Sequence, residues 1–294
     1  MPVLSDQARA KVNLTLRVNG RRVDGYHDLE SVVAFADCAD GLTLAPGPDL
    51  DLKMSGPLAQ ACGDTSDNLV LKAARLLAER VPDMKAGSFS LDKALPVAAG
   101  IGGGSAEAAA ALRLLAQLNG LALDDPRVVE VAKLTGADVP VCVNSLGCVM
   151  SGVGETLEPL SLPTMPCVMV NPGVPVATRD VFNALGLRNG ELLVGATDVL
   201  LQDRWPDAKA SLEDWVEALA ASSNDLEAPA MRVQPVIGEV ISALNATNGA
   251  WLARMSGSGA TCFAIYENTA EAGRAAEQLR RAHPGWWVHA GTLS

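Results

Sequence analysis

The sequence predicts an α+β protein built from two domains. Runs with the period-two alternation of β-strands and runs with the apolar spacing of α-helices occur in both halves of the chain. With 294 residues, 49% of them hydrophobic, the chain is long enough for more than one core. The proline-rich stretch SLPTMP, at residues 161–166, interrupts regular structure and is the best candidate boundary. We therefore expect domains at 1–160 and 161–294, with mixed or antiparallel sheets.

An antiparallel hairpin region opens the chain. In the stretch ARAKVNLTLRV, Val12 and Leu14 alternate with Lys11 and Asn13, so apolar and polar side chains point to opposite faces of a strand. The segment RRVDGYH has the composition of a turn, and a second alternating run follows it near LESVVAFADCADGLTLAP. This order predicts two paired strands.

Helices are expected after the hairpin region. DNLVLKAARLLAERV begins after Asp67 or Asn68, either of which can cap a helix. DPRVVEVAKLTG has Pro126 in its first turn and Gly136 at its end. The stretch VPVCVNSLGCVMSGVGETLEPL, from Val139 onward, is expected to form strands joined by a glycine turn.

The second half mixes the same two patterns. CVMVNPG predicts a short strand, and a poorly patterned region then extends to about Trp215 before helices begin. MSGSGATCFAIYE combines a loop of small residues, Ser256–Thr261, with a strand. AEAGRAAEQLRRA, at residues 270–282, predicts a final exposed helix.

The most informative segment is LPVAAGIGGGSAEAAAALRLLAQL, from Leu95 to Leu118. Its four glycines in five positions let the backbone approach a ligand and direct N–H groups toward one point. Ser105 is expected to cap the alanine-rich helix that follows, whose N-terminus favours an anion. The pattern predicts a cradle for nucleotide phosphates, and a glycine turn that only packs the helix against a strand is the alternative.

This glycine loop belongs to neither of the two commonest phosphate-binding classes. A Walker loop requires a lysine after the glycines, and none is present. A dinucleotide fingerprint requires a third glycine at the position of Ser105.

Composition limits the partners. The net charge of −11 argues against a general nucleic-acid binder, because such a protein needs a basic face. The six cysteines form no C-x-x-C pair and predict neither a zinc site nor a disulfide framework, which favours reduced thiols in the cytoplasm. Arg9, Lys11 and Arg17 interrupt any signal-peptide core, and we see no run of about 18 apolar residues that could span a membrane.

Three places could carry phosphoryl chemistry. Lys11 and Asn13 share one face of the first strand and could take part in the reaction. The alternative is that this polar face is only solvated. Asp138, in GADVP, could act as a base or only as a helix cap. The loop Ser256–Thr261 could lie against the first glycine loop or form an ordinary turn.

Six motifs occur along the chain in a recognisable order: ARAKVNLTLRVNGRRVDGYHDLESVV, DNLVLKAARLL, LPVAAGIGGGSAEAAAAL, GADVPVCV, NDLE and MSGSGATCFA. In this order they resemble the superfamily of galactokinase, homoserine kinase, mevalonate kinase and phosphomevalonate kinase, the GHMP kinases. The resemblance extends from Ala8 to the last strand and is weakest between Leu185 and Ser222. Within the superfamily, DGYH is similar to the segment of the branch whose substrate carries a cytidine diphosphate.

The resemblance implies a two-domain GHMP-kinase-like fold that uses ATP and Mg²⁺, with ATP binding and catalysis in residues 1–160 and substrate binding in 161–294. By its matching motifs it makes Lys11 and Asp138 the catalytic pair, and it assigns no side chain to a metal. It places ATP on the following residues: Asn68, Pro96, Val97, Ala98, Ala99, Gly100, Ile101, Gly102, Gly103, Gly104, Ser105 and Ala106. The chain departs from the superfamily at Ala98 and Ala99, where glycine is frequent, and at Ala106 and Glu107, where more polar residues are found.

The resemblance also implies a binding site for a small cytidyl substrate. Tyr26 and His27 match the residues that hold cytosine. Phe182, four residues after Thr178, matches their aromatic partner. Asn13 matches a contact to the methylerythritol hydroxyls.

The expected function is ATP-dependent phosphorylation of the 2-hydroxyl of a cytidyl-linked methylerythritol, a step of non-mevalonate isoprenoid synthesis, by a cytoplasmic kinase. A kinase of the same superfamily that acts on homoserine or mevalonate is the first alternative, and a non-catalytic nucleotide-binding module is the second. The expected partner is the small molecule, with neither nucleic acid nor membrane, and a homodimer is kept open.

Overall fold

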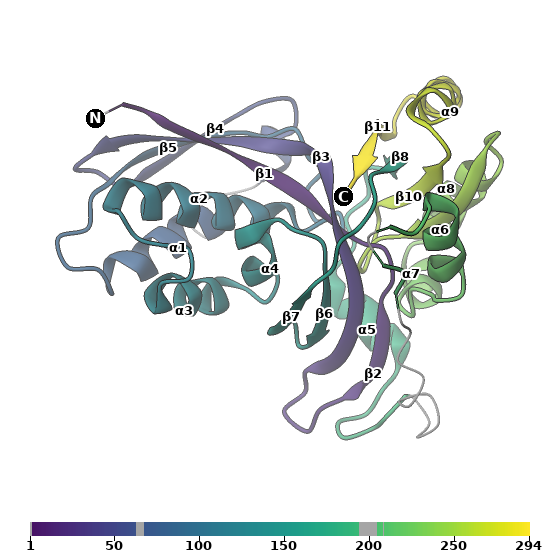
Figure 1. Ribbon diagram of the computed structural model, residues 1–294, viewed down its shortest axis with the longest axis horizontal. Helices are drawn as coiled ribbons and strands as arrows, with labels where there is room; N and C mark the ends of the chain where they lie inside the picture. The colour runs from purple at the N-terminus through teal and green to yellow at the C-terminus, as the bar shows by residue number, and fades with distance from the viewer. Residues whose placement is uncertain (1, 63–67, 194–204, 208) are drawn as a thin grey trace. The chain divides into compact units, whose positions relative to one another are not determined.

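The structure, a computed structural model, describes residues 2–62, 68–193, 205–207 and 209–294. The chain divides into two compact units, each made of three stretches of sequence. The first unit comprises Met1–Lys11, Cys38–Val97 and Gly102–Ser145, and the second comprises Val12–Asp37, Ala98–Ile101 and Leu146–Ser294. Strands and helices occur in both units (Figure 1), which confirms the predicted α+β class. The expected limits at residues 160 and 161 stay a prediction.

The sheet of the first unit is mixed, as predicted. Strand β5 (Ala86–Asp92) pairs in parallel with β4 (Asp51–Ser55) and antiparallel with the second half of the long strand β3 (His27–Gly47). Strand β1 (Leu4–Asn13) also pairs with β3. The strands contribute buried apolar side chains to the core of the unit: Leu42, Leu44, Leu52, Phe89 and Leu91.

Helices complete the first unit (Figure 1). They are α1 (Leu69–Ala78), α2 (Gly103–Asn119), α3 (Pro126–Thr135) and α4 (Val139–Asn144), with the short 3₁₀ helix η1 (Ala59–Cys62). Helix α2 packs against both α1 and α4. Its buried face is mostly alanine, which lets neighbouring backbones approach closely. The predicted helices after Asn68 and from Pro126 to Gly136 are confirmed.

One prediction in this unit is wrong. The residues VPVCVN, expected to start a strand, form helix α4. Pro140 suits the first turn of a helix, and the valines and Cys142 are buried, so packing overrides their β propensity. Strands β6 (Cys148–Gly152) and β7 (Thr156–Pro159) then follow as an antiparallel pair, as predicted.

The sheet of the second unit is antiparallel. Its order is the first half of β3, then β11 (Trp287–Leu293), β8 (Met165–Asn171), β10 (Cys262–Tyr266) and β9 (Ala250–Met255). Strand β2 (Arg17–Arg21) pairs with the start of β3, which confirms the predicted hairpin. Strand β6 pairs with the same part of β3.

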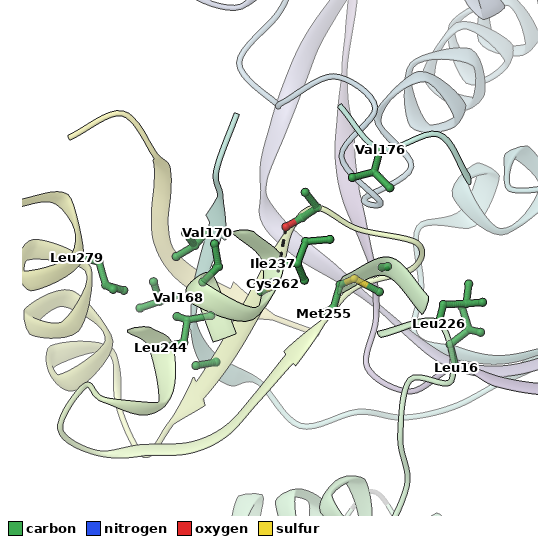
Figure 2. Close-up of a cluster of buried hydrophobic side chains, with 14 of the residues drawn as sticks. Leu16, Val168, Val170, Val176, Leu226, Ile237, Leu244, Met255, Cys262 and Leu279 are labelled. Atoms are coloured by element: carbon green, nitrogen blue, oxygen red, sulfur yellow. Dashed lines mark hydrogen bonds between the residues drawn. The ribbon is translucent and has the colours of Figure 1, made fainter. Parts of the chain in front are cut away.

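In the second unit, helix α8 (Val236–Asn245) packs against β9 and β10, and helix α9 (Thr269–Ala282) packs against β8 and β10. Figure 2 shows the resulting core, in which Val168 and Val170 of β8 meet Ile237 and Leu244 of α8 and Leu279 of α9. Helix α9 confirms the predicted final helix. The remaining helices are α5 (Thr178–Leu185), α6 (Leu212–Ala220) and α7 (Glu227–Val233).

Helix α5 corrects a second prediction, because it lies in the region expected to lack a pattern. It is only eight residues long, and Val181 is its fully buried side chain, so its apolar spacing is too short to stand out. Residues 194–204 and 208 of that region lie outside the described part of the chain. Of the helices that are described, none is long and apolar enough to cross a membrane.

Candidate active site

An ion pair joins Lys11 to Asp138 in the first unit. Lys11 is the last residue of this unit on β1 and is only 4% exposed, and its Nζ lies 3.0 Å from Asp138 Oδ2. The Asp138 side chain is 39% exposed. Asp138 occupies the N-cap position of α4, but its carboxylate accepts no capping hydrogen bond. A cap therefore does not explain this aspartate, whereas an accessible carboxylate held by a buried ammonium suits a proton acceptor.

The glycine loop continues past this ion pair. Gly102 has a left-handed backbone (φ +63°), and a Cβ built on it would lie 3.3 Å from Lys11 Cβ and 3.4 Å from Lys11 Cε. Helix α2 begins at Gly103 and has no acidic side chain in its first turn. The first N–H groups of a helix have no partner within it, and they favour an anion together with the helix dipole. The start of α2 beside Lys11 is thus suited to phosphate.

Ser105 is not the helix cap that the sequence predicted. The helix starts three residues earlier than predicted, at Gly103, and Gly102 is its N-cap, without any side-chain capping bond. At Gly102 the lack of a side chain keeps the N-cap clear of Lys11, because a Cβ there would lie 3.3 Å from Lys11 Cβ. Three N–H groups, on Gly103, Gly104 and Ser105, therefore belong to the first helical turn.

The central part of the loop, Ala98–Ile101, belongs to the second unit and lies against the loop Ser256–Thr261. Ala99 O accepts a hydrogen bond of 3.0 Å from Thr261 N, and Gly100 O accepts one of 3.0 Å from Ser256 Oγ. A Cβ on Gly100 would lie 2.5 Å from Ser256 O. This confirms that the two small-residue loops meet, and it explains why glycine is needed at residue 100.

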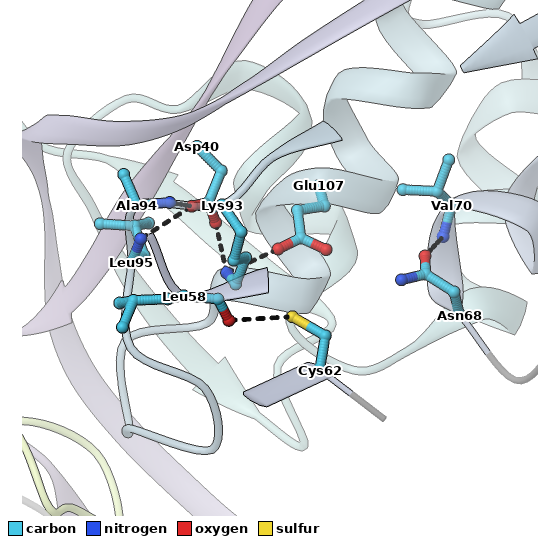
Figure 3. A network of polar contacts seen from close by, with 9 residues as sticks. All are labelled: Asp40, Leu58, Cys62, Asn68, Val70, Lys93, Ala94, Leu95 and Glu107. Carbon is cyan, nitrogen blue, oxygen red and sulfur yellow. Dashed lines mark hydrogen bonds and ion pairs between the residues drawn. The ribbon is translucent and has the colours of Figure 1, made fainter. Parts of the chain in front are cut away.

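A buried ionic triad lies behind the start of α2 (Figure 3). Lys93 Nζ is 2.5 Å from Asp40 Oδ2 and 2.7 Å from Glu107 Oε1, and all three side chains are 5% exposed or less. Asp40 Oδ1 also accepts the N–H groups of Ala94 and Leu95, at the start of the glycine loop. Burial raises the pKa of Glu107 to about 7, because Lys93 offsets the charge only in part and Asp40 repels it. The triad ties the chain that enters the loop to the helix that leaves it.

Asn68 caps helix α1. Its Oδ1 accepts the N–H of Val70 at 2.8 Å (Figure 3). The next residue, Leu69, places its Cδ1 3.7 Å from a Cβ built on Gly104. Asn68 therefore precedes Leu69, whose side chain lies near the start of α2. The role of Asn68 in nucleotide binding stays a prediction.

Asn13 is held firmly in the second unit. Its backbone N–H donates to Ser256 Oγ at 3.1 Å, and its Nδ2 donates to Ser31 Oγ at 2.7 Å. The side chain is buried, and Oδ1 has no hydrogen-bond partner among the described residues. A buried acceptor without a donor costs about 1–3 kcal/mol. A ligand hydroxyl would remove that cost, so Asn13 suits the role expected for it.

An aromatic group occupies the end of the β2–β3 hairpin. The ring of His27 stacks on that of Phe182, with centroids 4.3 Å apart and planes at 24°. His27 Nε2 is buried and unpartnered among the described residues, whereas Tyr26 is 63% exposed. Burial, and then the charge of Arg21, lower the pKa of His27. The structure thus presents an imidazole whose neutral form is favoured, with one unpartnered buried ring nitrogen and an exposed tyrosine beside it.

The chain is similar to known kinases over its whole length. The family model described as "GHMP kinases N terminal domain" matches residues 68–145, and "GHMP kinases C terminal" matches residues 207–285. A curated relative from Bradyrhizobium diazoefficiens, 4-diphosphocytidyl-2-C-methyl-D-erythritol kinase, is 72% identical over 100% of this chain and 99% of its own. The chain belongs to the 4-diphosphocytidyl-2-C-methyl-D-erythritol kinase family of GHMP kinases.

Solved structures agree with this assignment. A crystal structure of 4-(cytidine 5′-diphospho)-2C-methyl-D-erythritol kinase is 34% identical, covers 99% of both chains and has a TM-score of 0.76. Homoserine kinase from Cytophaga hutchinsonii has a TM-score of 0.72 over 100% of this chain and 95% of its own, at 18% identity, which shows the fold alone. The chain is thus a kinase with the GHMP fold.

In this kinase the structure brings together several residues that the sequence singled out. Lys11 lies with Asp138 and Gly102, and His27 lies with Phe182. A further contact, 2.9 Å between the hydroxyl oxygens of Thr178 and Ser258, joins the start of α5 to the second small-residue loop. The individual roles of these residues stay predictions.

The sequence analysis missed two members of the triad of this kinase. Lys93 and Asp40 stand 53 residues apart, so no local pattern connects them. The one available signal was the pair of charged residues, Asp92 and Lys93, between the apolar Leu91 and Leu95, just before the glycine loop. Charged residues at such a position are more often solvated than buried, which is why the signal was weak.

Proposed function

We propose that this kinase transfers the γ-phosphoryl group of ATP to the 2-hydroxyl of 4-(cytidine 5′-diphospho)-2-C-methyl-D-erythritol. The observation that carries the proposal is the Lys11–Asp138 pair, 3.0 Å apart, with Gly102 and the start of α2 against the lysine. Proton acceptor, cation and phosphate-binding N–H groups are what phosphoryl transfer to an alcohol requires.

In the proposed reaction, Asp138 accepts the proton of the attacking hydroxyl. Lys11 holds the Asp138 carboxylate in place and offsets negative charge near the transferred group. The N–H groups of Gly103, Gly104 and Ser105 bind phosphate oxygens, and a helix N-terminus binds such anions without a side chain. The transition state of phosphoryl transfer is loose in most analyses, so alignment contributes more than proton removal.

Mg²⁺ is expected to accompany ATP. Magnesium is usually bound through one or two carboxylates together with substrate phosphates, and it retains several waters. The 39% exposed carboxylate of Asp138 is proposed as the proton acceptor, so we assign it no metal and expect the phosphates of ATP to hold the ion. When bound, Mg²⁺ supplies positive charge to the phosphates.

The second unit is proposed to bind the cytidyl substrate. Asn13 Oδ1 accepts a hydroxyl of the methylerythritol, and the exposed ring of Tyr26 stacks on the base. His27 contacts the edge of the base through Nε2, which lacks a partner among the described residues. Phe182 supports the ring of His27 and so fixes its direction. Stacking of a base on an aromatic ring contributes about 1–3 kcal/mol.

We also propose a cytoplasmic kinase that binds neither nucleic acid nor membrane, with a homodimer as a state to be tested. The six cysteines form no C-x-x-C pair, which favours reduced thiols, and the net charge of −11 disfavours nucleic acid. Sedimentation equilibrium of the purified chain would determine the oligomeric state.

The test of the proposed function is ADP release with ATP and four acceptors: the cytidyl substrate, its uridyl analogue, homoserine and mevalonate. We expect the wild-type chain to use the cytidyl substrate and to favour it over the uridyl analogue by orders of magnitude, because uracil reverses the donor and acceptor pattern read by His27. His27→Ala should lose most of that preference through KM. Faster turnover of homoserine or mevalonate would overturn the proposal, and so would equal use of both nucleotides.

A further inference from the structure

The hairpin that carries Tyr26 and His27 is closed by its own backbone. Arg21 at the end of β2 lies directly opposite His27 at the start of β3. Between them, Arg22 N donates to Tyr26 O at 2.7 Å and Gly25 N donates to Arg22 O at 3.0 Å. These bonds close the turn, but they do not connect it to Phe182, which lies on α5.

The guanidinium of Arg21 makes that connection. Its Nε donates to Gly25 O at 3.2 Å, immediately before Tyr26, and its Nη1 donates to Leu187 O at 3.0 Å, two residues after α5 ends. A planar guanidinium donates in two fixed directions at once, which the single ammonium of lysine does not reproduce. This side chain therefore bonds both the turn that carries His27 and the segment that follows the helix with Phe182.

The backbone of the same strand confirms that this approach is close. Arg21 N donates to Glu191 O at 2.8 Å, and Gly190 N donates to Arg21 O at 2.7 Å. A Cβ built on Gly20 would lie 2.7 Å from Glu191 O, so a side chain at residue 20 would push the segment away. The segment after α5 is thus also attached to β2 by the backbone N–H and the backbone carbonyl of Arg21.

The contact that depends on this attachment is the stack of His27 on Phe182. Because the two rings come from different elements, their separation of 4.3 Å is set by how the hairpin and α5 are joined. A displaced Phe182 would let the imidazole turn and change the direction of Nε2. Misplacement of a binding group by about 1 Å can cost about 100-fold in activity.

We propose that Arg21 is a positioning residue for base recognition, which holds His27 against Phe182 and so sets the affinity and selectivity for the cytidyl group. The inference deepens the proposed function and rests on it. Arg21 acts through His27, and its effect should fall on substrate binding rather than on the transfer step, whose proposed groups are Lys11 and Asp138.

The test compares KM and kcat for the cytidyl substrate and its uridyl analogue in Arg21→Gln, Arg21→Lys and wild type. We expect Arg21→Gln to raise KM for the cytidyl substrate about 10- to 100-fold, to change kcat little and to reduce the preference over the uridyl analogue. Arg21→Lys keeps the charge without the two-directional donor, so an intermediate KM is expected. Arg188→Gln, the same change at an exposed arginine one residue after Leu187, is the matched control and should leave both constants unchanged.

A second variant keeps the charge of Arg21 and disturbs only the attachment. Gly20→Ala should also raise KM for the cytidyl substrate, because its Cβ displaces Glu191. If folded Arg21→Gln or Gly20→Ala keeps the wild-type KM and nucleotide preference, the proposal is wrong, and Arg21 serves stability alone. A loss confined to kcat would equally overturn it. Failure of the wild-type chain to use the cytidyl substrate would instead refute the proposed function, so the two failures are distinguishable.

Discussion

The substitution Glu107→Gln should change how the stability of the first unit depends on pH. In the wild-type chain, two buried carboxylates share the single ammonium of Lys93, and the pKa of Glu107 is raised from 4.5 to about 7. Glutamine has almost the same shape and keeps an oxygen acceptor for Lys93, but it carries no charge. The variant therefore removes one titration and leaves a neutral Lys93–Asp40 pair.

The direction in which pH changes the stability follows from how many protons the folded and unfolded chains bind. Because the pKa of Glu107 is higher in the folded chain than in the unfolded chain, the folded state binds more protons between pH 4.5 and about 7. The stabilisation is complete below pH 4.5 and is lost as pH rises through this range. Each pKa unit corresponds to about 1.4 kcal/mol, so the wild type should lose about 2–3 kcal/mol between pH 5 and pH 8 that Glu107→Gln does not lose.

The assay must report on the first unit. All five tryptophans lie in the second unit, so their fluorescence follows the wrong part of the chain and serves as an internal reference. Amide hydrogen exchange in α2, measured over a urea series, gives the free energy of unfolding of the first unit, and far-ultraviolet circular dichroism follows the whole chain. We expect wild type and variant to agree within about 1 kcal/mol at pH 5 and the variant to be the more stable at pH 8.

Glu130→Gln is the matched control. Glu130 is exposed on α3, and its hydrogen bond with Arg80 lowers its pKa, so its effect on stability has the opposite direction. Parallel pH profiles for wild type and Glu107→Gln would refute the reasoning, because they would show that the triad does not hold its extra proton in the folded state.

Three further outcomes are expected. Asp138→Asn and Lys11→Met should each lower kcat about 10²- to 10⁴-fold, while ATP still binds in equilibrium titration. Near-normal turnover of folded Asp138→Asn would show that Asp138 is not the base. Gly104→Ala should stabilise α2 by about 0.5–1 kcal/mol, since Leu69 leaves room for the new Cβ. The same variant should bind ATP more weakly in calorimetry, and an unchanged affinity would show that the loop is only a packing turn. Ala98, at φ +51°, is strained by about 1–2 kcal/mol, so Ala98→Gly should leave the melting temperature unchanged or raise it, and a clear decrease would contradict the strain.

The sequence predicted the parts of the fold whose signal is local. The hairpin of β2 and β3, the helices after Asn68 and from Pro126, and helix α9 all follow from alternation, caps and apolar spacing. Helix α4 does not, because its valines favour a strand in isolation and only burial against α2 selects the helix.

In the candidate site, too, some residues could be predicted from the sequence and others could not. Lys11, Asp138 and the glycine loop were found because their motifs match a family, and the geometry then supplied what a motif lacks: the absence of a capping bond on Asp138. Lys93 and Arg21 escaped the sequence analysis. Their partners, such as Glu107 and Leu187, are chosen by tertiary structure, and a single charged residue carries no information about that choice.

The interleaving of the two units has a consequence for how the chain reaches its native state. The polypeptide leaves the first unit after Val97 and returns to it at Gly102, and it first changes units at Lys11. Within the second unit, the bond from Asn13 N to Ser256 Oγ spans 243 residues. Contacts this distant in sequence make folding slow, because a long loop must close before they form. During translation, nearly the whole chain therefore has to be synthesised before the loop Ser256–Thr261 is available to Asn13 and Gly100. Neither unit can be released by a single cut, and a truncated product would expose the unpaired strand edges that promote aggregation.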